Sequence, residues 1–182
     1  MIKNMNGFKN MMSIEKEFDV KFTDIKFDDI IGQTNAKKLV AELVDILRNR
    51  DKYNNVGIKV PKGVLLHGPP GTGKTLIAKA LAGECNLPFV SACGSDFNAM
   101  FVGVGSARIR NLYESASREA KLQGGCIIFI DEIDTIGQKR TFTHSYGSNS
   151  ERENTLNQLL NEMDGFDSHT NVITLAATNR YD

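Results

Sequence analysis

One octapeptide constrains this chain more than any other part of it: residues 68–75 read GPPGTGKT. They fit the phosphate-binding loop pattern, in which a glycine, four further residues and Gly-Lys-Thr follow one another. A short apolar run at 64–66 precedes the motif, and a helix-forming run at 76–82 follows it. Glycines let successive backbone N–H groups line a concave anion site, and the start of a helix adds its positive dipole end. The alternative is a glycine-rich turn before a core helix. This alternative does not explain why a strand, the loop and a helix follow one another in this order.

The side chains of this loop predict a nucleoside triphosphate and magnesium as its ligands. Lys74 can reach the β- and γ-phosphates of ATP, and the Thr75 hydroxyl can hold Mg²⁺. ADP would occupy the same loop. The candidate nucleotide-binding residues here are Pro70, Gly71, Thr72, Gly73, Lys74, Thr75 and Leu76.

The composition is that of one soluble globular domain, with 182 residues, 41% of them hydrophobic and 24% charged. Because 22 basic residues balance 22 acidic ones, we expect no nucleic-acid partner. No apolar run approaches the roughly 20 residues that span a bilayer. Three scattered cysteines and the lack of a His-Glu-x-x-His pattern predict reduced thiols and no zinc site in this segment.

Strand and helix patterns alternate after a leader. We expect residues 1–26 to form a flexible leader and 27–182 the folded domain, with a mobile polar loop at 137–150. The expected strands are 63–67, 88–91, 126–130 and 172–177, and the expected helices are 34–50, 73–85, 106–122 and 151–163. The alternation predicts an α/β fold with a doubly wound parallel sheet, in which ligands bind beyond the carboxyl ends of the strands.

Two of the predicted strand ends carry polar side chains that suit ATP hydrolysis. Asp131 and Glu132 follow the apolar run 126–130. Asp131 suits a Mg²⁺-binding carboxylate, and Glu132 suits a general base that activates water for attack on the γ-phosphate. Asn179 follows 172–177 and could position that water or touch the γ-phosphate. A solvated turn after residue 130 and an ordinary turn asparagine are the alternatives.

The segment MFVGVG at 100–105 places an aromatic residue, Phe101, among glycines. Such a segment on the surface of a monomer is unusual. Its local sequence is equally compatible with a mobile loop that grips an extended polypeptide and with a loop whose Phe101 enters the core.

Taken in order, the motifs resemble a known family. The stretches VPKGVLL, GPPGTGKT, CIIFIDEID, TLNQLLNEMDGF and LAATNR look like the AAA ATPase module, a P-loop NTPase. Within it, SDFNAMFVGVGSARIRNLYESA is similar to the FtsH group of membrane-anchored zinc metalloproteases. The resemblance covers about residues 26–182. It implies a homo- or hetero-hexameric ring that hydrolyses ATP to pull unfolded or membrane polypeptides through a central pore towards a protease domain.

The resemblance also implies roles for single residues. Ile31 and Gly32 would lie against the adenine. Lys74 and Asn179 would contact the γ-phosphate, Asp131 would be the metal carboxylate and Glu132 the catalytic base. The candidate substrate pore loop would be Phe101, Val102 and Gly103, and signalling between subunits would involve Asp164, Gly165 and Phe166.

The family pattern contains further parts that we expect beyond residue 182: arginine fingers, a fifth strand bordering strand 63–67, a helical lid and the zinc-binding peptidase domain. Without the arginine fingers we expect slow turnover, since such a finger contributes ~10³–10⁵ in rate. Without the fifth strand, 63–67 would be an open edge. We expect a membrane-anchored parent in an organelle or a bacterial inner membrane. The alternatives are a protein-remodelling or proteasome-type AAA module, and an assembly module that binds nucleotide with little turnover.

Overall fold

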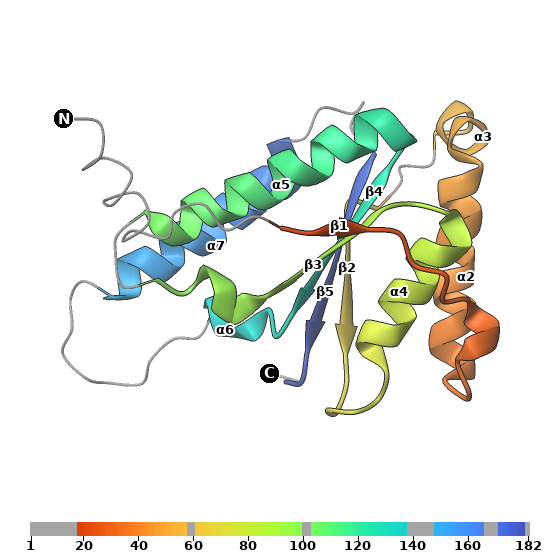
Figure 1. The fold of residues 1–182 in the computed structure, drawn as a ribbon, viewed down its shortest axis with the longest axis horizontal. Helices are drawn as coiled ribbons and strands as arrows, with labels where there is room; N and C mark the ends of the chain where they lie inside the picture. The colour runs from red at the N-terminus through yellow and green to blue at the C-terminus, as the bar shows by residue number, and fades with distance from the viewer. Residues whose placement is uncertain (1–17, 58–60, 100–102, 138–147, 166–170, 181–182) are drawn as a thin grey trace.

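A single sheet organises the residues that the structure, a computed structural model, describes, namely 18–57, 61–99, 103–137, 148–165 and 171–180. Within these ranges the strand order is β1-β3-β4-β5-β2 (Figure 1). The strands are β1 (Val20–Lys21), β2 (Gly63–His67), β3 (Phe89–Cys93), β4 (Cys126–Asp131) and β5 (Val172–Thr178). Neighbours among β2 to β5 are parallel, and β1 is antiparallel to β3. The α/β fold predicted from the sequence is confirmed, apart from this antiparallel strand.

Helices cover both faces of the sheet (Figure 1). One face carries α2 (Thr34–Arg48) and α4 (Lys74–Cys85), and the other carries α5 (Val104–Gln123) and α7 (Ser148–Gly165). The shorter helices are α3 (Arg50–Asn55), α6 (Asp134–Gly137) and the 3₁₀ turns η1 (Phe27–Asp29) and η2 (Gly94–Phe97). The predicted helix 34–50 ends early, and the helix predicted at 151–163 begins at residue 148, inside the segment expected to be a loop.

The central strand β4 explains why its sequence is apolar at every position. Ile127 and Phe129 face the core under α2 and α4, whereas Cys126, Ile128 and Ile130 face the core under α5 and α7. All five side chains are buried. A strand with parallel neighbours on both sides and helices on both faces has no solvated face for polar residues.

The expected flexible leader is wrong for its last nine residues, 18–26. Val20 and Lys21 pair with Val90 and Phe89, so they extend the sheet at the outer edge of β3. Phe18 is only 6% exposed, and its ring stacks on that of Phe97 with centroids 6.2 Å apart. Burial of this aromatic side chain supplies the stabilisation that a polar leader would lack. Residues 1–17 lie outside the described part of the chain.

Residues 18–30, called here the N-terminal strap, also fasten to α4. A Cβ atom on Gly83 would lie 2.0 Å from the carbonyl oxygen of Ile25, so only glycine allows this close approach. The Lys26 ammonium donates to the Gly83 carbonyl, and the Phe27 amide donates to Glu84 Oε1 at 3.2 Å. Phe18 packs in the core under α5, whereas Ile25 and Phe27 pack against the core under α4. The strap therefore connects the two core layers around the edge of the sheet.

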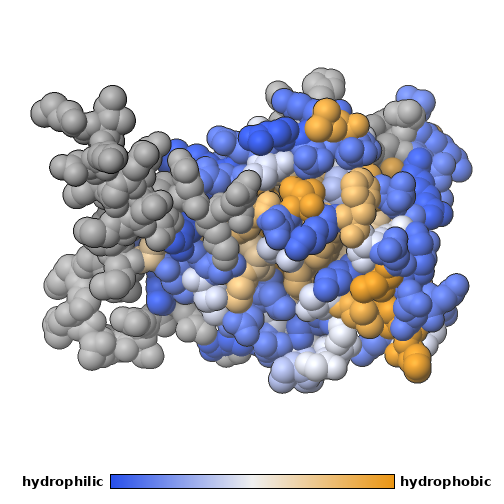
Figure 2. Space-filling model, in the orientation of Figure 1, coloured by the Kyte–Doolittle hydropathy of each residue, from blue (hydrophilic) through white to orange (hydrophobic). Residues whose placement is uncertain are grey.

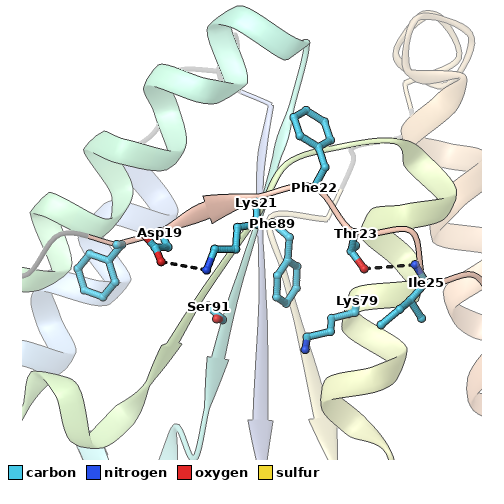
Figure 3. A pocket seen from close by; sticks show the side chains of 9 residues that line it. Asp19, Lys21, Phe22, Thr23, Ile25, Lys79, Phe89 and Ser91 are labelled. Atoms are coloured by element: carbon cyan, nitrogen blue, oxygen red, sulfur yellow. Dashed lines mark hydrogen bonds and ion pairs between the residues drawn. The ribbon is translucent and has the colours of Figure 1, made fainter.

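A pocket of about 500 Å³ lies where the strap crosses the start of β3 (Figure 3). Phe89 and Ser91 from β3 and Lys79 from α4 line it, together with strap residues that include the ion pair between Lys21 Nζ and Asp19 Oδ2 at 3.0 Å. This pair is mostly exposed and contributes little to stability. The pocket adjoins the first residues of β3, whereas ligands of such sheets bind at the opposite strand ends.

The surface seen from this side is mainly hydrophilic, with apolar residues gathered near β1 and near the lower end of α2 (Figure 2). Phe22 on the strap is 55% exposed, and Ile31, just before α2, is 98% exposed. Within the described ranges, none of the helices combines the length and the apolar character needed to cross a bilayer.

Candidate functional site

The loop between β2 and α4 has the backbone conformation that its glycines predict. Gly71 and Gly73 have φ angles of 76° and 86°, in the left-handed region that side-chain-bearing residues rarely adopt. Gly73 is the N-cap of α4, so the loop ends directly at the start of that helix. The first backbone N–H groups of a helix lack intrahelical acceptors and attract anions.

Lys74 joins this loop to the end of β5. Its Nζ donates to the Gly68 and Pro69 carbonyls at 2.8 and 2.9 Å, and to Asn179 Oδ1 at 2.8 Å. All three acceptors are neutral oxygens, so they hold the ammonium group in place without cancelling its charge. The positive charge remains available for an anionic ligand at the loop.

Thr75 and Asp131 meet across the same end of the sheet. Thr75 Oγ1, in the first turn of α4, donates to Asp131 Oδ2 at 3.2 Å. A hydroxyl and a carboxylate side by side are the hard oxygen ligands that Mg²⁺ prefers. In the described part of the chain, no three His, Cys, Asp or Glu side chains gather into a metal cluster. Thr75 Oγ1 and Asp131 Oδ2 are the two oxygens that could hold a Mg²⁺ ion at this end of the sheet.

Glu132 lies in a tight turn immediately after β4. Its φ angle is 50°, which is uncommon for a residue with a side chain. Its side chain is exposed, and its Oε2 accepts a hydrogen bond from the thiol of Cys93 at 3.7 Å. Cys93, at the end of β3, was not a sequence-based candidate. No motif includes Cys93, and its nearness to Glu132 follows only from the pairing of β3 with β4.

The end of β5 joins the loop after β2 to the turn after β4. The Thr178 carbonyl accepts from the Gly68 amide at 3.2 Å, and its hydroxyl donates to Asp134 Oδ1 at 2.9 Å. The Ala177 carbonyl accepts from the Ile133 amide at 2.9 Å. Sequence reasoning missed Thr178 and Asp134 because their partners become visible only once the strand order is known.

The segment before α2 also reaches the loop. Gln33 Nε2 donates to the Thr72 carbonyl at 3.2 Å, which brings Ile31 and Gly32 to the same end of the sheet. Gly32 has a φ angle of 79°. Ile31 is 98% exposed and Leu76, in the first turn of α4, is 37% exposed. These two apolar side chains are accessible to a flat apolar ligand such as an adenine ring.

The remaining candidates lie apart from these residues or outside the described ranges. Gly103, with φ 82°, is the N-cap of α5, and its amide donates to Glu151 Oε1 at 2.8 Å. The Asp164 carbonyl accepts from Lys62, which precedes β2 and so lies at the strand end opposite to the phosphate loop. Gly165 is the exposed last residue of α7. Phe101, Val102 and Phe166 lie outside the described residues.

Comparison with known proteins places this geometry in context. The family model described as "ATPase family associated with various cellular activities (AAA)" matches residues 64–182. The proteins named ATP-dependent zinc metalloprotease FtsH from Parabacteroides distasonis and Chlorobium luteolum are 56% and 55% identical over 92% and 98% of this chain. The protein of the same name from Rhodothermus marinus is 58% identical over 87% of the chain. The chain spans about a quarter of the length of these relatives, 24%, 24% and 22% respectively.

Proposed function

Because this chain belongs to the AAA family of ATPases, we propose that it binds ATP at the β2–α4 loop and hydrolyses it with Glu132 as the general base. The observation that carries the proposal is the convergence of three strand ends. Lys74 contacts Asn179 at 2.8 Å, and Thr75 contacts Asp131 at 3.2 Å. Side chains at the ends of β4 and β5 and in the first turn of α4 therefore lie together beside the glycine-rich loop, which supports the proposal.

Each side chain has a distinct part in this proposal. Lys74 and the first amides of α4 bind the β- and γ-phosphates. Thr75 and Asp131 would hold Mg²⁺, which supplies charge neutralisation at the phosphates when bound. Glu132 accepts the proton of the attacking water, and its exposed side chain leaves room for that water. Asn179 orients the water or the γ-phosphate without adding charge.

The Glu132→Gln variant tests this function. A glutamine keeps the size of the side chain but cannot accept the proton, so we expect hydrolysis to fall by about 10²–10⁴-fold while ATP affinity stays within a few-fold of the unmodified chain. Single-turnover hydrolysis and equilibrium binding of ATP measure the two quantities. Glu114→Gln, an exposed glutamate on α5, is the matched control and should change neither. Unchanged hydrolysis in Glu132→Gln would favour a nucleotide-dependent assembly module instead.

We further propose that the whole protein uses this ATPase to unfold polypeptides and thread them through a pore formed by a hexamer. The relatives are named as ATP-dependent zinc metalloproteases, which supports this proposal. Phe101, Val102 and Gly103 would contact the polypeptide, and Asp164, Gly165 and Phe166 would face a neighbouring subunit. Zinc would belong to a peptidase domain, and the resemblance to FtsH suggests a membrane anchor. In the whole protein, the same Glu132→Gln variant should bind substrate polypeptide without degrading it, and continued degradation would contradict this proposal.

A further inference from the structure

The turn that carries Glu132 is held through its main chain. The Glu132 carbonyl oxygen accepts two hydrogen bonds from one residue, Thr135: from its amide at 3.0 Å and from its hydroxyl at 2.9 Å. The φ angle of 50° at Glu132 is costly for a residue with a side chain, and such conformations persist only where the surroundings fix them. The contacts of this carbonyl therefore hold the backbone of the turn from which the Glu132 side chain projects.

Gly94 closes the other side of that carbonyl. It is buried and is the first residue of η2, directly after β3. A Cβ atom built on it would lie 2.3 Å from the Glu132 carbonyl oxygen and 2.3 Å from Thr135 Oγ1, far inside ordinary contact distances. The φ angle of Gly94 is not in the left-handed region, so space rather than backbone conformation requires a glycine here.

We propose that Gly94 and Thr135 are positioning residues for Glu132. The Thr135 hydroxyl holds the Glu132 carbonyl, and the missing side chain at Gly94 lets β3 and η2 pack directly against it. Neither residue touches the reacting atoms. Any side chain at position 94 forces η2 and this carbonyl apart, which disturbs the packing of the turn. The proposal rests on the role of Glu132 proposed above.

The chain contains a similar pair on α5 and α7, which touches η2 at Phe97 but does not contact the Glu132 turn. A Cβ atom on Gly105, in α5, would lie 2.5 Å from the Phe97 carbonyl oxygen and 2.6 Å from Thr155 Oγ1. The Thr155 hydroxyl donates to the Glu151 carbonyl at 2.8 Å, as that of Thr135 does to Glu132. Both pairs thus combine a buried glycine, a carbonyl and a threonine hydroxyl. Only the first pair contacts Glu132.

The experiment compares Gly94→Ala with Gly105→Ala, and Thr135→Val with Thr155→Val. We expect Gly94→Ala to lower the single-turnover rate of ATP hydrolysis by about 10²-fold, the loss that a displacement of about 1 Å produces. Thr135→Val should lower it by about tenfold, and Thr135→Ser, which keeps the hydroxyl, should restore it. ATP affinity should stay within about threefold in every variant, because the loss is confined to the chemical step. The two control variants should lose thermal stability, and each should lose much less rate than its partner at the Glu132 turn.

The proposal is overturned if Gly94→Ala keeps the rate of the unmodified chain, or if the control variants lose as much rate as their partners. Should Gly94→Ala not fold, the threonine variants decide: equal rates for Thr135→Val and Thr135→Ser overturn the proposal. The Glu132→Gln variant distinguishes a failure of the proposed function from a failure of this inference. If it stays active, the role of Glu132 fails and this inference fails with it. If it is inactive while Gly94→Ala is fully active, this inference alone fails.

Discussion

Asn179 and Lys74 are 105 positions apart in the chain, yet their side-chain atoms lie 2.8 Å apart. Replacing Asn179 by alanine removes a neutral acceptor of the ammonium group and the amide proposed to orient the water or the γ-phosphate. We expect Asn179→Ala to lower the hydrolysis rate by about 10–10²-fold, an order typical of a lost positioning contact, with ATP affinity changed less than the rate. Single-turnover hydrolysis and ATP titration measure both.

Asn171 provides the control for that variant. It stands just before β5, at the opposite end of the strand from Asn179, and its Nδ2 donates to the Gly124 carbonyl at 2.7 Å. Asn171→Ala should leave the rate unchanged and affect stability alone. Equal rates for Asn179→Ala and the unmodified chain would show that the amide at position 179 has no part in the reaction.

The closeness of Lys74, Thr75, Asp131 and Asn179 could be predicted from the sequence. Motif spacing places the first two, and the rule that parallel strands present their carboxyl ends together places the others. Gly94, Cys93 and Gln33 could not be predicted in the same way. Their contributions are a missing side chain, a contact between strand ends and a contact to a loop carbonyl, and none of these leaves a periodic or spaced pattern in the chain.

At the scale of elements, the N-terminal strap offers a direct test with two phenylalanines. Phe18 is 6% exposed and stacks on Phe97, whereas Phe22 is 55% exposed. We expect Phe18→Ala to lower the free energy of unfolding by about 3–5 kcal/mol, because a buried aromatic leaves a cavity in the core under α5. Phe22→Ala should cost less than about 1 kcal/mol, since most of its ring already contacts water.

Urea denaturation of both variants gives the two free energies of unfolding. The comparison is matched in residue type, in substitution and in element. Equal losses in the two variants would mean that the strap does not bury Phe18 in solution, and that the leader expected from the sequence extends through residue 26 after all.

The success of element prediction depends on how many residues carry the pattern. Strand 63–67 was predicted with the bounds that the structure gives, because an apolar run followed by a glycine-rich loop marks both of its ends. β1 has two residues and no period of its own, so only the exposed edge of β3 makes it a strand. The predicted helix 34–50 likewise divides into α2 and α3 around Asn49, where no proline or glycine announces a break.

At the scale of the whole molecule, two ionisable side chains buried in the core make the stability fall at alkaline pH. Burial raises the pKa of the Cys126 thiol from 9.0 to about 12, and burial raises the pKa of Tyr113 beyond its usual range. The native state therefore keeps protons that the unfolded chain releases. Stability from these groups is complete below their unfolded pKa values and is lost as pH rises towards the folded ones.

We expect the free energy of unfolding to fall above about pH 9, with Cys126 accounting for at most about 1.4 kcal/mol per pH unit. Cys126→Ala should reduce this slope, and the slope that remains should come partly from Tyr113. Urea denaturation at a neutral and at an alkaline pH measures the change. At neutral pH the thiol is protonated in both the folded and the unfolded state, so the difference between the two chains there measures the loss of packing alone. That difference is the reference for the change at alkaline pH. An identical slope in the two chains would contradict the prediction.

The strap that joins the two core layers is synthesised before the residues to which it binds. Protein synthesis completes the strap before its partner on α4, because Gly83 stands 57 positions after Lys26. At translation rates of about 5–20 residues per second, the strap waits roughly 3 to 11 seconds for that partner. During this interval Phe18 and Phe22 are available to chaperones at the ribosome exit. The strap therefore docks only after α4, β3 and η2 have been made, although it precedes all of them in the chain.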